Sequence, residues 1–143
     1  MPVRHSSAVW NGVLRSGSGK VTVGKGVFEG AYSFASRFED GTGTNPEELI
    51  GAAHAACLSM ALAAGLERAG TPAERVATKA SVTLEKVGDA FRITKIRLEV
   101  RGRVPNLTAA AFKEAAEKAK DGCPVSNALK GNVALELDAA LES

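Results

Sequence analysis

The sequence predicts an α+β fold with antiparallel sheets, in which a long central helix lies between two groups of strands. Three observations carry this prediction: short strand-like segments fill the first 40 residues, a long apolar helix follows them, and alternating segments then flank shorter helices. The chain has 143 residues, of which 45% are hydrophobic and 24% charged. This composition is typical of one soluble globular domain, and since no linker interrupts the chain we expect residues 1–143 to form a single domain.

The N-terminal strands are predicted from short alternating segments between Gly- and Ser-rich turns. They comprise residues 8–14, 20–23 and 31–39. In the third segment the period of two places Phe34 and Phe38 on one face and Arg37 on the other. The guanidinium of Arg37 is therefore expected to point away from the aromatic side chains.

A strong helix-start signal comes at Asn45-Pro46-Glu47-Glu48, where Asn45 can cap, Pro46 suits the first helical position and Glu48 can close a capping box. The helix is expected to end near Ala69, before a Gly-Thr-Pro sequence. Residues 49–66 are all uncharged, which is long enough for a membrane span. We reject that interpretation because much of the segment is Ala and Gly, His54 lies inside it, and charged residues flank both ends.

A helix that is apolar on all sides is expected to be buried. Its 18 uncharged residues would extend about 27 Å, whereas a chain of this length has a radius of gyration of about 14–15 Å. One chain could barely cover such a helix. We therefore expect a homodimer in which two of these helices pack together through their small residues.

The second half of the chain is predicted to contain a hairpin of two long strands, residues 75–87 and 90–104, with a bulge between Ile93 and Ile96. An amphipathic helix over residues 108–120 follows, with Phe112 on its core face. A short helix begins after Cys123, and residues 132–141 form the last strand.

Charge and targeting signals restrict the function classes. Lys and Arg total 18 against 16 Asp and Glu, a net charge of +2 that does not suit a dedicated nucleic-acid binder. The basic residues of the strand over 90–104 are interrupted by Glu99 and lack stacking aromatics, so we interpret them as a solvated strand face. They are Arg92, Lys95, Arg97, Arg101 and Arg103. No apolar segment of signal-peptide length opens the chain, so we expect a cytoplasmic protein with reduced thiols.

The two cysteines are too few for a disulfide framework, and each has a structural alternative. Cys57 lies in the apolar helix, where a free cysteine is commonly a small buried hydrophobe. Cys123 directly precedes a helix start, where the helix dipole favours a thiolate. His54 shares a helix face with Cys57 but is interpreted as a packed core histidine. The few His and Cys residues lack the spacing of a structural zinc site, so no metal is expected.

Two segments together carry a family resemblance. They are Asn45-Pro46-Glu47-Glu48-Leu49-Ile50-Gly51-Ala52-Ala53-His54-Ala55-Ala56-Cys57 and Lys118-Ala119-Lys120-Asp121-Gly122-Cys123-Pro124-Val125-Ser126. With them the chain resembles the osmotically inducible protein C and organic hydroperoxide resistance (OsmC/Ohr) family, and is more similar to the OsmC branch. The resemblance extends from Trp10 to the final strand.

The resemblance implies an intertwined homodimer of OsmC-like fold and a thiol-dependent peroxidase that needs no cofactor. Its substrates would be organic hydroperoxides and, in the OsmC branch, hydrogen peroxide. By position, Cys57 corresponds to the peroxidatic cysteine and Cys123 to the resolving cysteine. Arg37 and Glu47 correspond to the polar pair that activates the thiol. An external dithiol, lipoyl-type or other, would then reduce the disulfide.

The physical chemistry of thiols fits these roles. A thiol with an ordinary pKa is only about 3% thiolate at pH 7, and burial lowers that fraction further. Arg37 can stabilise the thiolate while a carboxylate holds the guanidinium in a bidentate grip. Ten residues of helix separate Glu47 from Cys57 by about 15 Å. The site is therefore expected either to combine residues from two chains or to use Arg37 as a bridge.

Two other functions remain open at this point. A dithiol oxidoreductase acting on protein disulfides is disfavoured because the chain has no Cys-x-x-Cys pair. A non-enzymatic, stress-associated binding module would leave both cysteines structural. Neither nucleic acid nor a membrane is expected as a partner.

Overall fold

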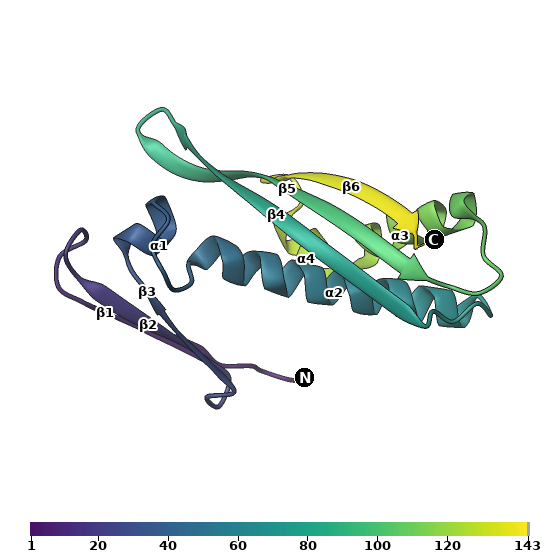
Figure 1. The fold of residues 1–143 in the computed structure, drawn as a ribbon, viewed down its shortest axis with the longest axis horizontal. Coiled ribbons are helices and arrows are strands. Elements are labelled where there is room, and N and C mark those ends of the chain that lie inside the picture. The colour runs from purple at the N-terminus through teal and green to yellow at the C-terminus, as the bar shows by residue number, and fades with distance from the viewer. Residues whose placement is uncertain (143) are drawn as a thin grey trace. The chain divides into compact units, whose positions relative to one another are not determined.

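The computed structural model describes residues 1–142 and contains two three-stranded sheets and a long helix, α2 (Figure 1). The mixed α and β architecture and the central helix agree with the predicted fold class. By its internal contacts the chain divides into two units, Met1–Leu49 and the remainder from Ile50 onward. Each unit is described separately below.

The N-terminal unit is built on an antiparallel meander of three strands, β1 (Ser6–Asn11), β2 (Ser18–Val23) and β3 (Phe28–Tyr32). The rings of Trp10 and Tyr32 pack across the sheet with centroids 5.3 Å apart. Gly19 on β2 passes between them, and a Cβ there would come within 2.4 Å of the Tyr32 ring. The position therefore requires glycine because the two aromatic side chains occupy the space above it.

The third predicted strand is wrong beyond Tyr32, because the chain turns there into a short helix, α1 (Phe34–Phe38). Ser33 caps this helix: its hydroxyl accepts from the Ser36 amide, and the Ser36 hydroxyl accepts from the Ser33 amide. This reciprocal capping favours a helical turn instead of the strand that the alternating sequence pattern predicted. Arg37 consequently lies in the last turn of α1. The expectation that its guanidinium points away from the aromatic side chains is wrong, because the guanidinium carbon lies over the Phe38 ring, 5.3 Å from its centroid.

The long helix α2 (Pro46–Arg68) begins and ends close to the predicted positions. Asn45 caps it, since its side chain accepts a hydrogen bond from the Glu48 amide at 2.8 Å. The Glu48 carboxylate accepts from the Thr44 hydroxyl, at 3.0 Å, which differs from the predicted capping box. At the other end Gly70, with φ of 85°, allows the Thr71 amide to bond back to the Leu66 carbonyl.

The second unit contains the sheet β4 (Arg75–Val87), β5 (Ala90–Arg103) and β6 (Ala134–Leu141). β4 and β5 form the predicted hairpin, and Thr94 is the extra residue of the predicted bulge, since Ile93 pairs with Leu84 and Lys95 with Thr83. β6 pairs parallel to β5, so the prediction of purely antiparallel sheets is wrong here. The two helices α3 (Ala109–Gly122) and α4 (Pro124–Leu129) form a crossover that returns the chain parallel to β5.

The core of this unit lies between α2, α3 and the sheet. One face of α2 is buried, with Leu58, Leu62 and Leu66 packed in a cluster that includes Leu98 of β5 and Phe112 of α3. By length and composition alone α2 could span a membrane, yet this face belongs to the core, so α2 is a partly buried core helix. The expectation that α2 is buried on all sides does not hold within one chain, because Met60 on another face is 75% exposed.

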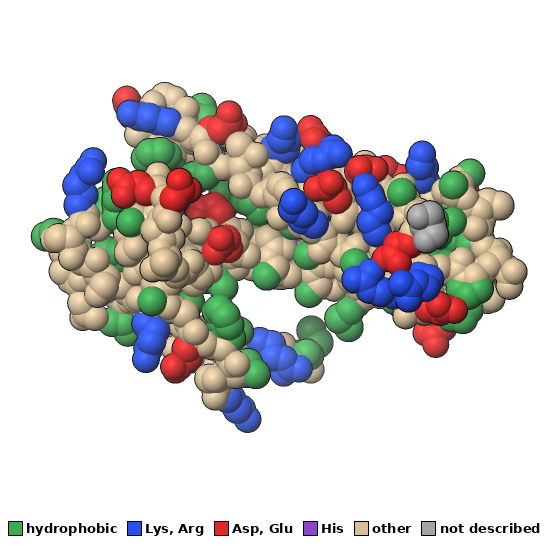
Figure 2. Space-filling view, viewed as in Figure 1, with side chains coloured by type: hydrophobic (Ala, Val, Ile, Leu, Met, Phe, Trp, Pro, Cys, Tyr) green, Lys and Arg blue, Asp and Glu red, His purple; other side chains and the backbone are tan. Residues whose placement is uncertain are grey.

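The outer face of the second sheet carries charges of both signs (Figure 2). Arg97 and Arg101 of β5 both pair with Asp138 of β6, at 3.3 Å and 3.1 Å, and Arg103 pairs with Glu142 at 3.1 Å. The acidic residues of β6 and the chain after it therefore partner these arginines. This pairing agrees with the interpretation of a solvated strand face.

Candidate functional site

Two free thiols from distant parts of the chain meet in the second unit. Cys57 projects from the middle of α2, and Cys123 lies at the junction of α3 and α4. Although 66 residues separate them, their Sγ atoms are 2.9 Å apart. Cys123 is fully buried whereas Cys57 is partly exposed. The pair can therefore form a disulfide with little movement, and Cys57 is the sulfur that a small molecule can reach.

The surroundings of the thiols favour protonation of Cys57. Burial raises the pKa of the Cys57 thiol, and the neighbouring Cys123 raises it further, while the Val125 amide opposes them. Burial would also raise the pKa of the Cys123 thiol, but its hydrogen bond with Cys57 and the polar groups of Ser126 and Val125 outweigh burial and lower it. The groups around Cys57 in this unit thus raise its pKa on balance, and a nearby cation would favour the thiolate.

His54 is fully buried and points to the helix that follows Cys123. Its Nε2 lies 2.7 Å from Oγ of Ser126 on α4, and Ser126 is itself only 3% exposed. Burial lowers the pKa of His54 below 6.5, so the ring is neutral at pH 7. The interpretation of His54 as a packed core histidine is confirmed, and its partner Ser126 was missed. The signal for Ser126 was available, because it lies three residues after Cys123 at a helix start.

The N-terminal unit contains an ion pair between Arg37 and Glu47. Arg37 donates from Nε and Nη2 to one oxygen of Glu47, at 3.0 Å and 2.8 Å. The guanidinium therefore makes two hydrogen bonds to a single carboxylate oxygen. Glu47 is 7% exposed, and its other oxygen, Oε2, is buried with no partner among residues 1–142. The Arg37 side chain is more exposed, at 37%, so the carboxylate fixes a guanidinium that remains accessible.

An apolar cavity of about 420 Å³ lies beside Arg37 in the same unit. Aromatic side chains form much of its wall, and Arg37 is the charged residue among those that line it. The aromatic residues are Trp10, Tyr32, Phe34 and Phe38. A cavity of this kind suits a molecule with an apolar tail and a polar head.

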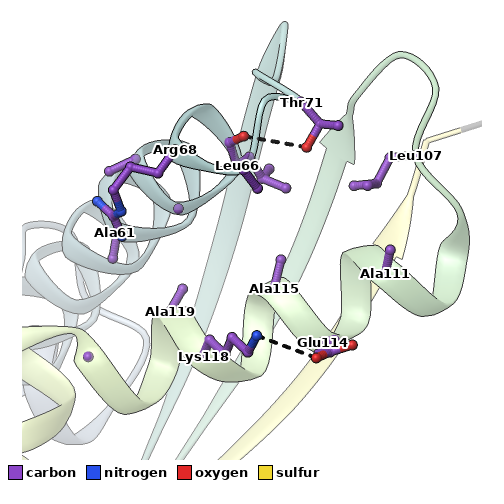
Figure 3. A pocket seen from close by; sticks show the side chains of 14 residues that line it. Ala61, Leu66, Arg68, Thr71, Leu107, Ala111, Glu114, Ala115, Lys118 and Ala119 are labelled. Carbon is purple, nitrogen blue, oxygen red and sulfur yellow. Dashed lines mark hydrogen bonds and ion pairs between the residues drawn. The ribbon is translucent and has the colours of Figure 1, made fainter.

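Apart from this cavity, a groove of about 570 Å³ runs between the C-terminal half of α2 and α3 (Figure 3). Small apolar side chains such as Ala61 and Ala115 line it, and Lys118 and Glu114 form an ion pair across one turn of α3, at 3.4 Å. Neither cysteine belongs to its lining. The groove therefore does not belong to the thiol site.

The four predicted site residues thus form two pairs, Cys57 with Cys123 and Arg37 with Glu47. A free thiol pair at hydrogen-bonding distance, with one sulfur buried and the other accessible, is typical of a two-cysteine thiol redox protein. The comparisons with known proteins agree with this class. Residues 39–138 match the family described as OsmC-like protein, and the chain belongs to that family.

Curated relatives include proteins from both branches of the family. The chain is 46% identical over 134 residues to the peroxiredoxin OsmC of Escherichia coli strain K12, covering 93% of this chain and 94% of that protein. It is 35% identical over 102 residues to the organic hydroperoxide resistance protein of Xanthomonas axonopodis pv. citri, covering 70% and 69%. The higher identity and coverage fit the predicted OsmC branch.

Solved structures agree on the fold. An organic hydroperoxide resistance protein OsmC from Legionella pneumophila superposes with a TM-score of 0.77 at 25% identity, covering 98% of this chain and 99% of that one. The organic hydroperoxide resistance protein OhrB of Bacillus subtilis gives a TM-score of 0.76 at 26% identity, covering 94% and 97%.

Proposed function

We propose that this chain is a cytoplasmic, thiol-dependent peroxidase that reduces organic hydroperoxides and hydrogen peroxide. The observation that carries the proposal is the 2.9 Å approach of the Cys57 and Cys123 sulfurs in a chain 46% identical to a peroxiredoxin. The aromatic cavity beside Arg37 supports a preference for hydroperoxides with an apolar substituent. The two thiols of the chain are the redox-active groups, and an external dithiol supplies the reducing equivalents.

In the first step the Cys57 thiolate attacks the distal oxygen of the peroxide. The O–O bond breaks, the alkoxide leaves with the electron pair and takes up a proton, and Cys57 becomes a sulfenic acid. Cys57 is the attacking sulfur because it is partly exposed, whereas Cys123 is fully buried.

Arg37 is proposed to supply the cation that Cys57 lacks. Its guanidinium is permanently charged, and Glu47 holds it through two hydrogen bonds. A cation beside a thiol favours the thiolate and so lowers the pKa that burial raises. We propose that the Arg37 of one chain serves the Cys57 of the partner chain, because about 15 Å of helix separates Glu47 from the Cys57 of its own chain.

The proposed assembly is an intertwined homodimer. The face of α2 that is exposed in the single chain is apolar, and Met60 on it is 75% exposed. Small neighbours on that face, including Ala52, Ala53, Ala56 and Ala63, would allow a second α2 to approach closely. Burial of this face against a second copy would remove it from water.

In the second step the Cys123 sulfur attacks the Cys57 sulfenic acid. An S–S bond forms, the S–O bond breaks, and the hydroxide that leaves becomes water. An external dithiol, lipoyl-type or other, then reduces the disulfide by exchange and restores both thiols.

The test is peroxide consumption by the purified protein in the presence of dihydrolipoamide. We expect catalytic turnover of cumene hydroperoxide that is lost in Cys57→Ser. Turnover by Cys57→Ser at the wild-type rate would overturn the proposal.

A further inference from the structure

His54 is a buried polar residue that the proposed reaction does not use. Its side chain is 0% exposed, and a polar ring so placed needs a reason because an unsatisfied buried group costs stability. Nε2 has one partner, Oγ of Ser126 at 2.7 Å, whereas Nδ1 is buried without a partner in the part of the chain that is described. The contact with Ser126 is therefore the interaction that this ring provides.

Ser126 connects His54 to the resolving cysteine. Cys123 is the N-cap residue of α4 and Ser126 is its third helical residue, two positions that adjoin at a helix start. In the structure the Cys123 side chain makes no capping hydrogen bond to α4, so a bond from the Ser126 hydroxyl would form with the thiolate. The Ser126 side chain and amide both lower the pKa of the Cys123 thiol. His54, Ser126 and Cys123 are each at least 97% buried, so they interact in a medium of low dielectric where polar contacts are strong.

The direction of the hydrogen bonds follows from the unpartnered ring nitrogen. A neutral imidazole carries one N–H, and a buried N–H without an acceptor is rarer than a buried acceptor without a donor. The proton therefore lies on Nε2 and is donated to Oγ of Ser126. The Ser126 hydroxyl hydrogen is then free to point to Sγ of Cys123.

We propose that His54 and Ser126 are positioning residues for the resolving step, in which the neutral imidazole fixes the Ser126 hydroxyl as a donor to the Cys123 thiolate. This inference rests on the proposed peroxidase function. The thiolate with its electron pair attacks the Cys57 sulfenic sulfur, and hydroxide leaves with the S–O electron pair. Of the two thiol protons of the reduced chain, one ends in the alcohol and the other in water.

The groups that face Cys123 come from two helices. α2 contributes Cys57, and α4 contributes the Ser126 hydroxyl with the amides of Val125 and Ser126. The β5 side chains buried in the core of this unit, Ile96, Leu98 and Val100, are apolar. Since His54 stays neutral near pH 7, the pH dependence of resolution follows the Cys123 thiol itself.

The experiment separates the two steps in a single turnover. Reduced protein is mixed with cumene hydroperoxide and quenched into dimedone and an alkylating agent, and intact mass distinguishes thiol, sulfenic acid and disulfide. In Ser126→Ala and His54→Leu the sulfenic acid should form at the wild-type rate. The midpoint of the pH profile for disulfide formation should rise by about one unit, which makes resolution about tenfold slower below the midpoint.

Conservative variants and a matched control distinguish positioning from packing. Ser126→Thr keeps a hydroxyl and His54→Gln keeps an N–H near Nε2, so both should retain the wild-type midpoint. The control Ser59→Ala removes a part-buried hydroxyl on α2, which is hydrogen-bonded to Thr78 at 2.7 Å, and should leave the midpoint unchanged. An unchanged midpoint in Ser126→Ala, or an equal rise in Ser59→Ala, would overturn the inference.

A second readout is independent of the peroxidase reaction. In a Cys57→Ser background the thiolate absorbance of Cys123 can be titrated without peroxide, and adding Ser126→Ala should raise its midpoint. If wild-type Cys57 fails to react with cumene hydroperoxide, the proposed function fails while this titration still decides the roles of His54 and Ser126. A titration that Ser126→Ala does not move would contradict them.

Discussion

The two units of the chain hold different parts of the proposed chemistry. The unit from Ile50 onward contains the thiol pair and the buried His54–Ser126 contact, and its surroundings raise the pKa of Cys57. The unit Met1–Leu49 contains a held guanidinium and an aromatic cavity but no cysteine. The packing that brings the two sulfur atoms together also raises the pKa of Cys57 and so disfavours its thiolate. A positive charge from outside this unit would favour the thiolate. A dimer in which each chain serves the other would supply this charge.

The largest expected effect comes from removing the reacting sulfur. Cys57→Ser should reduce peroxide consumption to the rate of the uncatalysed reaction, because serine is a far weaker nucleophile at neutral pH. Cys123→Ser is the matched control: it should still be oxidised once by cumene hydroperoxide and should accumulate a sulfenic acid that dimedone traps. Equal loss of the first oxidation in both variants would contradict the separate roles of the two thiols.

Removing the positive charge of Arg37 should have the next largest effect. Arg37→Ala should raise the pKa of Cys57 by about one to three units and slow its oxidation at pH 7 about 10- to 1000-fold. The chain should stay folded but lose about 1–3 kcal/mol of stability, because the nearly buried Glu47 carboxylate loses both hydrogen bonds from Arg37. Rates of peroxide loss and urea unfolding measure the two quantities, and Glu47→Gln should slow oxidation less because the charge remains.

Mixed dimers test whether the charge crosses between chains. If Arg37 serves the partner, a dimer of one Cys57→Ser chain and one Arg37→Ala chain contains one complete site and recovers about half of the wild-type activity. If Arg37 serves its own chain, the mixed dimer contains none and stays slow. A dimer of one wild-type chain and one chain with both substitutions should stay slow if Arg37 serves the partner. The same dimer should recover about half of the activity if Arg37 serves its own chain.

The dimer itself is tested on the exposed face of α2. Met60→Lys places a charge on an apolar face and should convert the dimer to monomer in light scattering, because a buried unpaired ammonium is costly. Val87→Lys, at the exposed end of β4, is the control and should stay dimeric. A wild-type chain that is monomeric at micromolar concentration would contradict the proposed assembly.

The smallest effect is a pH dependence of stability from His54. Its pKa is lowered in the folded state, so below pH 6.5 the unfolded chain binds more protons than the folded one. The free energy of unfolding should therefore fall as the pH drops below 6.5, by at most about 1.4 kcal/mol per pH unit. His54→Gln should remove this slope, whereas the exposed His5→Gln should keep it; urea unfolding between pH 7 and pH 5 measures both.

Much of the fold could be predicted because long elements carry strong signals. The capping of α2 by Asn45, the β4–β5 hairpin and the bulge at Thr94 all follow from local pattern. Helix α1 could not be distinguished from a strand, because five residues with alternating aromatics fit both periods and reciprocal serine capping decides between them. The parallel pairing of β6 depends on the path of α3 and α4, which no local pattern specifies.

The site was predictable in its residues but not in its contacts. Cys57 and Cys123 were assigned by resemblance, yet only the folded chain brings their sulfurs to 2.9 Å. The Arg37–Glu47 pair was expected, but the single-oxygen grip and the unpartnered Oε2 depend on side-chain geometry. Ser126 was missed because a serine near a helix start is ordinarily a capping residue, and its partner His54 lies 72 positions away.

The most direct test of the two-thiol reaction is a single turnover followed by peptide mapping. Reduced protein treated with one equivalent of cumene hydroperoxide should lose both thiols, form one equivalent of cumyl alcohol, and yield a peptide pair in which Cys57 is linked to Cys123 of the same chain. Thiols that remain reduced, or a disulfide that joins the two cysteines only between chains, would contradict the account.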